Sequence, residues 1–405
     1  MQINFENILK AKEVLDGNIK LTPTIRADQL GKKLGCELYL KLECLQLTSS
    51  FKARGANVAV KNAMARHPGK GLIAMSAGNH AQAVAYNADR EGNSALIVMP
   101  EQAPFSKVAR TRGYGAEVIL RGRTLSETTN FVQTLAMEKD LLLIHPYDNC
   151  DVISGQGTIG LEIIESVSDL DFLLVPIGGG GLISGISIAV KRINPKIKII
   201  GVEAGLYPSM FNLRNKTSLP CNGETIADGI AVKYPGSLNV PIIEKNVDDI
   251  ILVDEISIEK SISALFEDER IISEGAGAVG VAAIKENKKF FYNKKVGTII
   301  CGGNIDGRIF AGVLNKQLSR DGKLARIRID ITDEPGMLAR IATLISKSGG
   351  NIIEILHQRM FHDVPVKKAK IDAVIEAQNA NNITGIIKGL EKAGFVVARL
   401  NENSE

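Results

Sequence analysis

The sequence predicts an α/β protein with parallel sheets, followed by a smaller α+β domain at the carboxyl end. Short apolar runs rich in β-branched residues alternate with helix-like segments between residues 71 and 304. This alternation is typical of parallel strands that helices cover on both faces. From residue 324 the order of the elements changes to βαββαβ, the ferredoxin-like arrangement. A chain of 405 residues is also long for one hydrophobic core.

The first part of the chain is predicted to begin with a helix over residues 4–16, because Ile8, Leu9, Val14 and Leu15 recur near one face. Strands are predicted where short apolar runs occur, over 35–43, 71–76, 94–100, 116–122, 141–146, 171–178, 197–204, 248–255 and 296–304. Helices are predicted between several of these strands, over 79–91, 106–114, 124–138 and from near Leu182 onward.

A polar segment over 317–323 is predicted to link the two parts of the chain. In the second part, strands are predicted over 325–333, 351–360, 369–378 and 396–400, and helices over 334–350 and 383–395. We therefore predict a first domain over residues 1–320, with a smaller subdomain at roughly 46–148, and a second domain over 324–405.

Composition and charge exclude several classes of protein. The chain has 49 basic and 45 acidic side chains without a long block of either sign, so neither a nucleic-acid nor a membrane-surface partner is expected. The five cysteines are scattered without a CxxC pair, which favours free thiols in a reducing cytoplasm. The uncharged stretch 172–190 is nearly long enough to span a membrane, but Pro176 and four glycines interrupt it. We expect a soluble cytoplasmic protein without a signal peptide.

A glycine quartet, Gly178, Gly179, Gly180 and Gly181, joins a predicted strand to a predicted helix. Glycines let the backbone approach an anion, and a helix N-terminus offers unpaired N–H groups. A tight turn is the simpler explanation, but it does not require four glycines, so the pattern favours a phosphate site. A dinucleotide fingerprint would need glycine where Ile183 stands, and a Walker A loop would need a closing GK[ST]. A smaller monophosphate remains.

Lys52 stands among small and apolar residues in SSFKARGAN, which covers residues 49–57. Taken alone, such a lysine is most simply a solvated surface charge. Desolvation would instead lower the pKa of its amine and make it a nucleophile. The residues around Lys52 leave both interpretations open.

Four segments occur in an order that resembles the pyridoxal-phosphate enzymes of the tryptophan-synthase-like group. They are SSFKARGAN, SAGNHAQ at 76–82, the glycine quartet, and CGGNID at 301–306. The chain resembles in particular the threonine ammonia-lyases (threonine dehydratases) with one C-terminal ACT domain, over essentially its whole length. The resemblance implies the two-subdomain fold of that group, pyridoxal 5′-phosphate as cofactor and a lyase reaction.

The resemblance implies a role for each segment. Lys52, which follows Phe51, would hold the cofactor as a Schiff base and act as the catalytic base. Asn79 would bind the 3′-oxygen of the cofactor, and Glu274 would lie near its ring. Cys301 would face the pyridine nitrogen, where a neutral thiol favours loss of a β-leaving group; a small buried core cysteine is the alternative. The phosphate would bind to Gly178, Gly179, Gly180, Gly181 and Leu182.

The resemblance also places the substrate carboxylate at a helix N-terminus, on the turn Ser76, Ala77, Gly78, Asn79 and His80. A purely structural role is the alternative for His80. Eukaryotic serine racemases have a serine as the second residue of this turn, acting as an acid/base, where this chain has Ala77. Dehydration is therefore implied, of L-threonine to 2-oxobutanoate and ammonia and of L-serine to pyruvate. A serine racemase, a broad serine dehydratase and an inactive amino-acid sensor that keeps the cofactor are the alternatives.

Some relatives bind a divalent metal near the strand that follows the glycine loop. Glu203 matches their glutamate ligand, but Ser209 stands where an acidic partner is expected. A hard cation needs several oxygen ligands. The sequence therefore predicts no metal, and it leaves open whether a cation binds near Glu203.

The segment DITDEPGMLARI, over 330–341, resembles the ACT signature. The resemblance implies domains that pair side by side, an amino-acid effector such as isoleucine, a homo-oligomer (a dimer or a tetramer) and a place in isoleucine biosynthesis. A domain that serves assembly alone is the alternative. The candidate effector contacts are Asp333, Gly336, Met337, Leu338 and Asn351.

Overall fold

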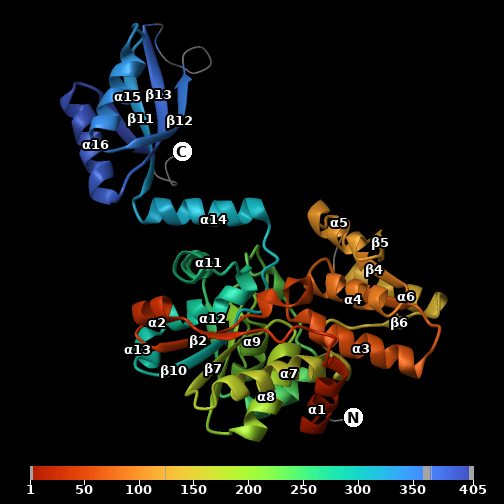
Figure 1. Cartoon of the computed structure of the whole chain (residues 1–405). Coiled ribbons are helices and arrows are strands. Elements are labelled where there is room, and N and C mark those ends of the chain that lie inside the picture. Colours follow the sequence, from red (N-terminus) through yellow and green to blue (C-terminus); the bar gives the residue numbers. More distant parts are fainter. Residues whose placement is uncertain (1–2, 124, 359–364, 366, 401–405) are drawn as a thin grey trace. The chain divides into compact units, whose positions relative to one another are not determined.

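The computed structural model describes residues 3–123, 125–358, 365 and 367–400, and the chain divides into two compact units, 1–305 and 306–405 (Figure 1). Within the described part of the first unit, every strand pairing except that of β1 with β2 is parallel. The predicted α/β class with parallel sheets is therefore confirmed.

The larger sheet of the first unit has the strand order β1-β2-β10-β7-β8-β9. Its strands are β1 (Thr24–Arg26), β2 (Glu37–Lys41), β7 (Phe172–Pro176), β8 (Lys198–Ala204), β9 (Asp249–Val253) and β10 (Lys295–Ile299). All but β1 were predicted, since three residues are too few to show an apolar pattern. The helices that follow the chain around this sheet are α1 (Phe5–Leu15), α2 (Asp28–Leu34), α7 (Cys150–Ser166), α8 (Gly181–Ile193), α9 (Ser209–Asn215), α10 (Asn239–Asn246), α11 (Glu255–Glu269), α12 (Gly275–Glu286) and α13 (Lys288–Phe291). Short 3₁₀ turns occur at η1 (Glu43–Leu45), η2 (Leu47–Ser49) and η3 (Asp228–Ile230).

The smaller sheet has the strand order β5-β4-β3-β6. Its strands are β3 (Leu72–Met75), β4 (Ala95–Met99), β5 (Glu117–Leu120) and β6 (Leu142–Leu143), and its helices are α3 (Lys52–Arg66), α4 (Asn79–Arg90), α5 (Phe105–Gly113) and α6 (Leu125–Glu138). The predicted strands and helices of this region are confirmed to within a few residues. Thr124, the first residue of the helix predicted over 124–138, lies outside the described residues.

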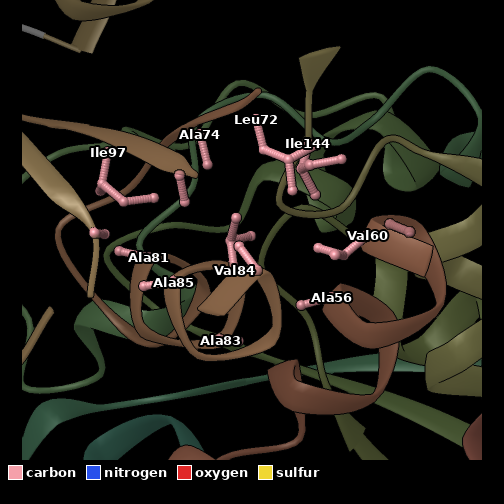
Figure 2. Close-up of a cluster of buried hydrophobic side chains, with 14 of the residues drawn as sticks. Ala56, Val60, Leu72, Ala74, Ala81, Ala83, Val84, Ala85, Ile97 and Ile144 are labelled. Atoms are coloured by element: carbon pink, nitrogen blue, oxygen red, sulfur yellow. The ribbon is translucent and has the colours of Figure 1, made fainter. Parts of the chain in front are cut away.

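A core of small side chains holds α3 and α4 against the smaller sheet (Figure 2). Ala56 and Val60 of α3 lie beside Val84 of α4, and strand residues such as Leu72 and Ile97 close the cluster. Because alanines dominate the α4 face, the helices approach the strands closely. Each of these two helices begins at a residue of the predicted site, Lys52 or Asn79. The core therefore fixes the positions of both helix N-termini.

The second unit begins with α14 (Gly307–Arg320) and continues with a sheet of order β12-β13-β11-β14. The elements after α14 are β11 (Leu324–Thr332), α15 (Met337–Lys347), β12 (Asn351–Gln358), β13 (Lys368–Glu376), α16 (Ala380–Lys392) and β14 (Val396–Leu400), which is the predicted βαββαβ order. Isoleucines of β11 and β13 pack against those of both helices. The last two residues of the strand predicted over 351–360 and residues 401–405 of the second predicted domain lie outside the described residues.

The polar link predicted over 317–323 is wrong in its first four residues, which form the last turn of α14. Asp306 caps the start of this helix by accepting hydrogen bonds from two backbone N–H groups, and Gln317 Nε2 donates to Asp321 Oδ1 over 2.8 Å at its end. Residues up to 320 were assigned to the first domain from the sequence, whereas α14 groups with the second unit.

The uncharged stretch 172–190 forms β7, the glycine loop and most of α8. Among the described residues, no helix is both long enough and apolar enough to cross a membrane.

A buried ion network anchors the first turns of α3. Arg54 is fully buried and donates to both carboxylate oxygens of Glu43 over 2.8 Å and to both oxygens of Glu162. Lys41 also donates to Glu162, and Thr22 to Glu43. Two cations and two anions therefore balance inside the protein, and they join β2, η1, α3 and α7 close to Lys52.

Replacing Arg54 by alanine is expected to lower the free energy of unfolding by about 3–5 kcal/mol, because Glu43 and Glu162 would lose the charge that compensates their burial. Arg66 is a matched control on the same helix: it pairs with Asp151 at 3.0 Å, but its side chain is 62% exposed. Arg66→Ala should therefore cost about 0–1 kcal/mol. Denaturant unfolding followed by circular dichroism measures both values, and equal losses would contradict the role given to the Arg54 network.

Candidate active site

Lys52 is the first residue of α3, and its amine faces the loop after β6. Lys52 Nζ donates to the backbone carbonyl of Pro146 over 2.7 Å and lies 5.1 Å from the centre of the Phe51 ring. Burial lowers the pKa of this amine from 10.5 to about 8, although Cys301 and Glu274 act in the opposite direction. Of the two interpretations left open by the sequence, the structure favours a desolvated amine over a solvated surface charge.

The segment CGGN lies directly beside Lys52. The Phe51 N–H donates to the carbonyl of Cys301 over 3.0 Å, and Ser50 forms a bridge with Gly302. Cys301 is buried, and burial together with Glu274 raises the pKa of its thiol well above the usual range. The thiol is therefore neutral at physiological pH.

Asn79 and Glu274 meet next to the CGGN segment, since the Glu274 N–H donates to the carbonyl of Gly302 over 3.0 Å. The Asn79 Nδ2 group donates to Glu274 Oε1 over 2.8 Å, and Asn79 Oδ1 accepts from Asn304 Nδ2 over 2.8 Å. Glu274 precedes α12 and is only 5% exposed. Burial raises the pKa of its carboxyl to about 7, and the hydrogen bond from Asn79 opposes this rise.

The turn before α4 presents backbone N–H groups at a helix N-terminus. Ser76 Oγ accepts from the Gly78 N–H over 3.1 Å, and the Ala77 side chain packs against the core of the smaller sheet. Gly78 lacks a side chain that could cap α4. Hence the first N–H groups of α4 are open to an anion.

The His80 side chain cannot donate a hydrogen bond to a substrate carboxylate. It is buried, and its Nε2 lies 2.8 Å from the carbonyl of Ile144, so this nitrogen must carry the proton. Burial lowers the pKa of the imidazole to about 3, and therefore Nδ1 carries no proton. The side chain has no N–H left for a substrate carboxylate, and only the backbone N–H of His80 remains for that role.

Both close steric contacts and the unpaired N–H groups at the start of α8 explain why four glycines occur together. Gly180 has φ of +93°, a left-handed conformation, and it precedes the first residue of α8 without a capping side chain. A Cβ on Gly179 would fall within 2.3 Å of the Tyr147 ring, and one on Gly178 would lie 2.9 Å from Ile230. The backbone N–H groups at the start of α8 have no acceptor among the described residues, namely those of Gly181, Leu182 and Ile183.

The loop Ile144–Tyr147 connects these parts. The strand predicted over 141–146 ends at Leu143, and no functional role was predicted for the residues that follow it. The carbonyls of this loop bind His80 and Lys52, while Tyr147 packs on the glycine loop. Asn239 Nδ2 donates over 3.0 Å to the carbonyls of both Tyr147 and Gly179, which fixes the two segments together. The position of His145-Pro146 directly after a parallel strand could have pointed to this loop, because ligands bind at the carboxyl ends of such strands.

Glu203 is engaged by its own chain. It is fully buried and accepts hydrogen bonds from the Ser209 hydroxyl at 3.2 Å and from the backbone N–H groups of Met210 and Phe211 at 2.9 Å. Burial raises the pKa of its carboxyl to about 7. In this structure Glu203 thus caps α9, and no cluster of metal-ligating side chains occurs within the described ranges.

The predicted effector contacts do not form one cluster within a single chain. Asp333, Gly336, Met337 and Leu338 lie between the end of β11 and the start of α15, whereas Asn351 begins β12. Asn351 and Leu324 both pair with Glu376 of β13, so Asn351 lies level with Leu324 across the sheet. Leu324 is eight residues before the end of β11. Eight residues of strand span about 26 Å. Within one chain, Asn351 therefore lies apart from the other four residues.

The site fits pyridoxal phosphate on two observations. The start of α8 offers unpaired N–H donors on glycines that leave the backbone bare, which suits a phosphate group. Lys52 offers an amine with a lowered pKa, which suits covalent attachment to an aldehyde. Pro146 and Tyr147 are consecutive residues that contact the amine and the glycine loop respectively, so the two features lie close together.

Comparisons with known proteins agree with this geometry. Residues 15–302 match the family model described as "Pyridoxal-phosphate dependent enzyme". An L-threonine ammonia-lyase from Thermotoga maritima is 40% identical over 98% of this chain and 99% of its own length. A catabolic L-threonine dehydratase, TdcB, from Staphylococcus aureus is 42% identical over 78% of this chain and 93% of its own.

Among solved structures, maize serine racemase superposes with a TM-score of 0.73 at 32% identity, over 79% of this chain and 99% of that one. The similarity thus extends from sequence to fold, and it includes the Lys52 segment and the glycine loop within the matched residues. The chain belongs to the family of pyridoxal-phosphate dependent enzymes.

Proposed function

We propose that this protein is a threonine ammonia-lyase, which converts L-threonine to 2-oxobutanoate and ammonia and also accepts L-serine. The observation that carries the proposal is the desolvated amine of Lys52, held by Pro146 beside the glycine loop. The names of the Thermotoga maritima and Staphylococcus aureus relatives support the choice of threonine.

In the proposed reaction, Lys52 is the catalytic base. The bound cofactor supplies an electron-withdrawing system that acidifies the α-proton of the amino acid. The free amine of Lys52 removes this proton, and its lowered pKa keeps a substantial fraction unprotonated near neutral pH. The β-hydroxyl leaves with a proton as water. The released 2-aminocrotonate then tautomerises and hydrolyses to 2-oxobutanoate and ammonia.

The turn from Ser76 to His80 is the proposed site for the substrate carboxylate. Its donors are the backbone N–H groups at the start of α4, among them that of Asn79. The second N–H of the Asn79 side-chain amide would bind the 3′-oxygen of the cofactor, and the N-terminus of α8 would bind its phosphate. Glu274 and the Cys301 thiol complete the surroundings of the cofactor ring.

Elimination is proposed over racemisation because of Ala77 and Cys301. An alanine at position 77 offers no proton donor on the face opposite Lys52, so a proton could be removed but not returned from the other side. A neutral Cys301 thiol also disfavours storing negative charge in the ring. The fold similarity to maize serine racemase keeps a racemase as the second candidate function.

We further propose that the second unit is an ACT domain that binds an amino-acid effector such as isoleucine and couples it to activity in a cytoplasmic homo-oligomer. Supporting this, the Thermotoga maritima lyase matches across both units, whereas the catabolic Staphylococcus aureus enzyme covers 78% of this chain. The βαββαβ fold of the unit and the separation of Asn351 from Asp333 favour a site shared by two copies.

Lys52→Ala is expected to abolish the visible absorbance of the cofactor–lysine linkage and to lower turnover of threonine by at least ~10²–10⁴-fold, because the base is lost. Absorbance spectra and an ammonia-release assay measure the two effects. Lys61→Ala on the same helix, where the side chain pairs with Glu91, is the control and should change neither. If Lys52→Ala kept the band and turnover, the proposal would fail. A band in the unchanged protein without ammonia release would identify an inactive sensor instead.

Attachment of the cofactor to the apo-protein should become faster as pH rises, with a midpoint near 8 rather than 10.5, because only the neutral amine of Lys52 is nucleophilic and burial lowers its pKa. Stopped-flow absorbance after addition of pyridoxal phosphate measures the rate. Free Nα-acetyl-lysine serves as the control with an unshifted amine. A protein midpoint that matched this control would show that Lys52 is solvated.

The products formed from L-serine and L-threonine distinguish a threonine ammonia-lyase from a serine racemase. With L-serine, we expect pyruvate to form in large excess over D-serine, because Ala77 cannot return a proton to the opposite face. With L-threonine, 2-oxobutanoate should form with a kcat/KM that differs from the serine value by about 10–200-fold, the range expected for one methyl group in a pocket. Chiral chromatography and an oxo-acid assay measure these products. Substantial D-serine would favour the racemase.

A further inference from the structure

An exposed arginine on the smaller sheet's side reaches the buried site through a chain of hydrogen bonds. Arg110 lies on α5, and its Nη1 donates to Asn304 Oδ1 over 2.7 Å. Asn304 Nδ2 donates to Asn79 Oδ1 and to the carbonyl of Thr48, each over 2.8 Å. Asn79 Nδ2 then donates to Glu274 Oε1. These residues come from α5, the loop after β10, α4 and the N-cap of α12.

Arg110 and the Thr48 carbonyl together set the direction of this chain. A guanidinium group only donates hydrogen bonds and a carbonyl only accepts them, so the oxygen of the Asn304 amide must face Arg110 and its nitrogen must face Thr48. The nitrogen of the same amide must then face Asn79, which in turn directs the Asn79 oxygen toward Asn304. The Asn79 nitrogen is left facing Glu274. Because each amide has one donor end and one acceptor end, the orientation that Arg110 and the Thr48 carbonyl give to Asn304 passes on to Asn79.

The orientation of the Asn79 amide matters because its nitrogen carries two N–H groups. One donates to Glu274, and the second is available to the cofactor oxygen that Asn79 is proposed to bind. A reversed amide would place an oxygen against both Glu274 and the cofactor oxygen. Asn304 also steadies Glu274 through its backbone N–H. The direction of the chain is therefore coupled to cofactor binding.

Helix α5 is held in place by a second contact. Lys107, one turn before Arg110, forms an ion pair with Asp228 of η3. α5 follows β4 of the smaller sheet, whereas Asn304 follows β10 of the larger sheet and Asp228 lies between β8 and β9. Arg110 and Lys107 thus link the two sheets of the first unit beside the site.

We propose that Arg110 is a positioning residue that fixes the direction of the Asn79 amide through Asn304, and so presents a donor to the cofactor. This inference rests on the proposed function, since it takes Asn79 as a cofactor-binding residue. Arg110 itself touches neither substrate nor cofactor. Any donor of similar reach can replace it, and an acceptor opposes the orientation of Asn304.

The test uses the full-length protein with three substitutions, Arg110→Lys, Arg110→Met and Arg110→Glu. Arg110→Met should raise the apparent Kd for pyridoxal phosphate by about tenfold, the amount expected for one hydrogen bond. Arg110→Glu should raise the Kd further and shift the visible band, because an acceptor would face the Asn304 oxygen and oppose the orientation that the Thr48 carbonyl favours. Arg110→Lys should stay within about threefold of the unchanged protein. Absorbance titration of the apo-protein gives the Kd and the band position.

Arg112 supplies matched controls, because it is an exposed arginine on the same helix. Arg112→Met and Arg112→Glu make the same changes of size and charge and should leave the Kd and the band unchanged. In an Asn79→Ala background, Arg110→Met should have no further effect on the Kd, since the two residues act in series.

Three results would overturn the inference: an Arg110→Met protein with an unchanged Kd, an Arg110→Lys protein as impaired as Arg110→Met, or an Arg110→Met effect that persists in the Asn79→Ala background. Failure of the proposed function would look different. In that case the unchanged protein would itself show no lysine-linked band, whereas failure of the Arg110 inference alone leaves that band and threonine turnover intact.

Discussion

The buried pairing of Arg54 with Glu43 and Glu162 is the constraint on which the rest of the site depends. It ties the start of α3 to η1 and α7, and Lys52 stands two residues before Arg54. A lysine near a helix N-terminus could otherwise extend into solvent. Because the guanidinium is held on both carboxylates, the first turn of α3 cannot rotate, and the Lys52 amine is kept under the carbonyl of Pro146. The charged network and the position of the Lys52 amine are therefore connected through the first turn of α3.

The loop Ile144–Tyr147 then holds several other parts of the site in place. Its backbone carbonyls fix the tautomer of His80 and hold Lys52, and Tyr147 covers the glycine loop. Backbone groups suit this task because their positions are set by β6 and α7 rather than by mobile side chains. Next to Glu274, the Asn79 amide donates to the carboxylate and is itself bound by the Asn304 amide. The site is thus held partly by backbone carbonyls and partly by side-chain amides.

Much of this was predictable from particular residues. Apolar runs predicted the parallel strands, because fully buried strands need continuous hydrophobic sequence, and the three-residue β1 was missed. Several helices, among them α2, α7, α11 and α14, were not given bounds from the sequence. Lys52, Asn79, the glycine quartet and Cys301 were predicted as site residues through their segments. The roles of Pro146, Tyr147, Asn239 and Arg110 were not, since each acts through a backbone atom or a long-range partner that local sequence does not reveal. For His80, the sequence could not tell which nitrogen would be engaged by Ile144.

The sequence by itself determined the α/β class, the βαββαβ order after residue 323, the glycine loop before α8 and the absence of a proton donor at Ala77, because these follow from periodicity and residue type. Only the tertiary structure decided that Lys52 is desolvated, that the Cys301 thiol stays neutral and that Glu203 caps α9. It also decided that Asn351 lies apart from Asp333. The physical reason is the same in each case: a pKa, a tautomer or a shared site depends on groups that are distant in sequence and meet only when the chain folds.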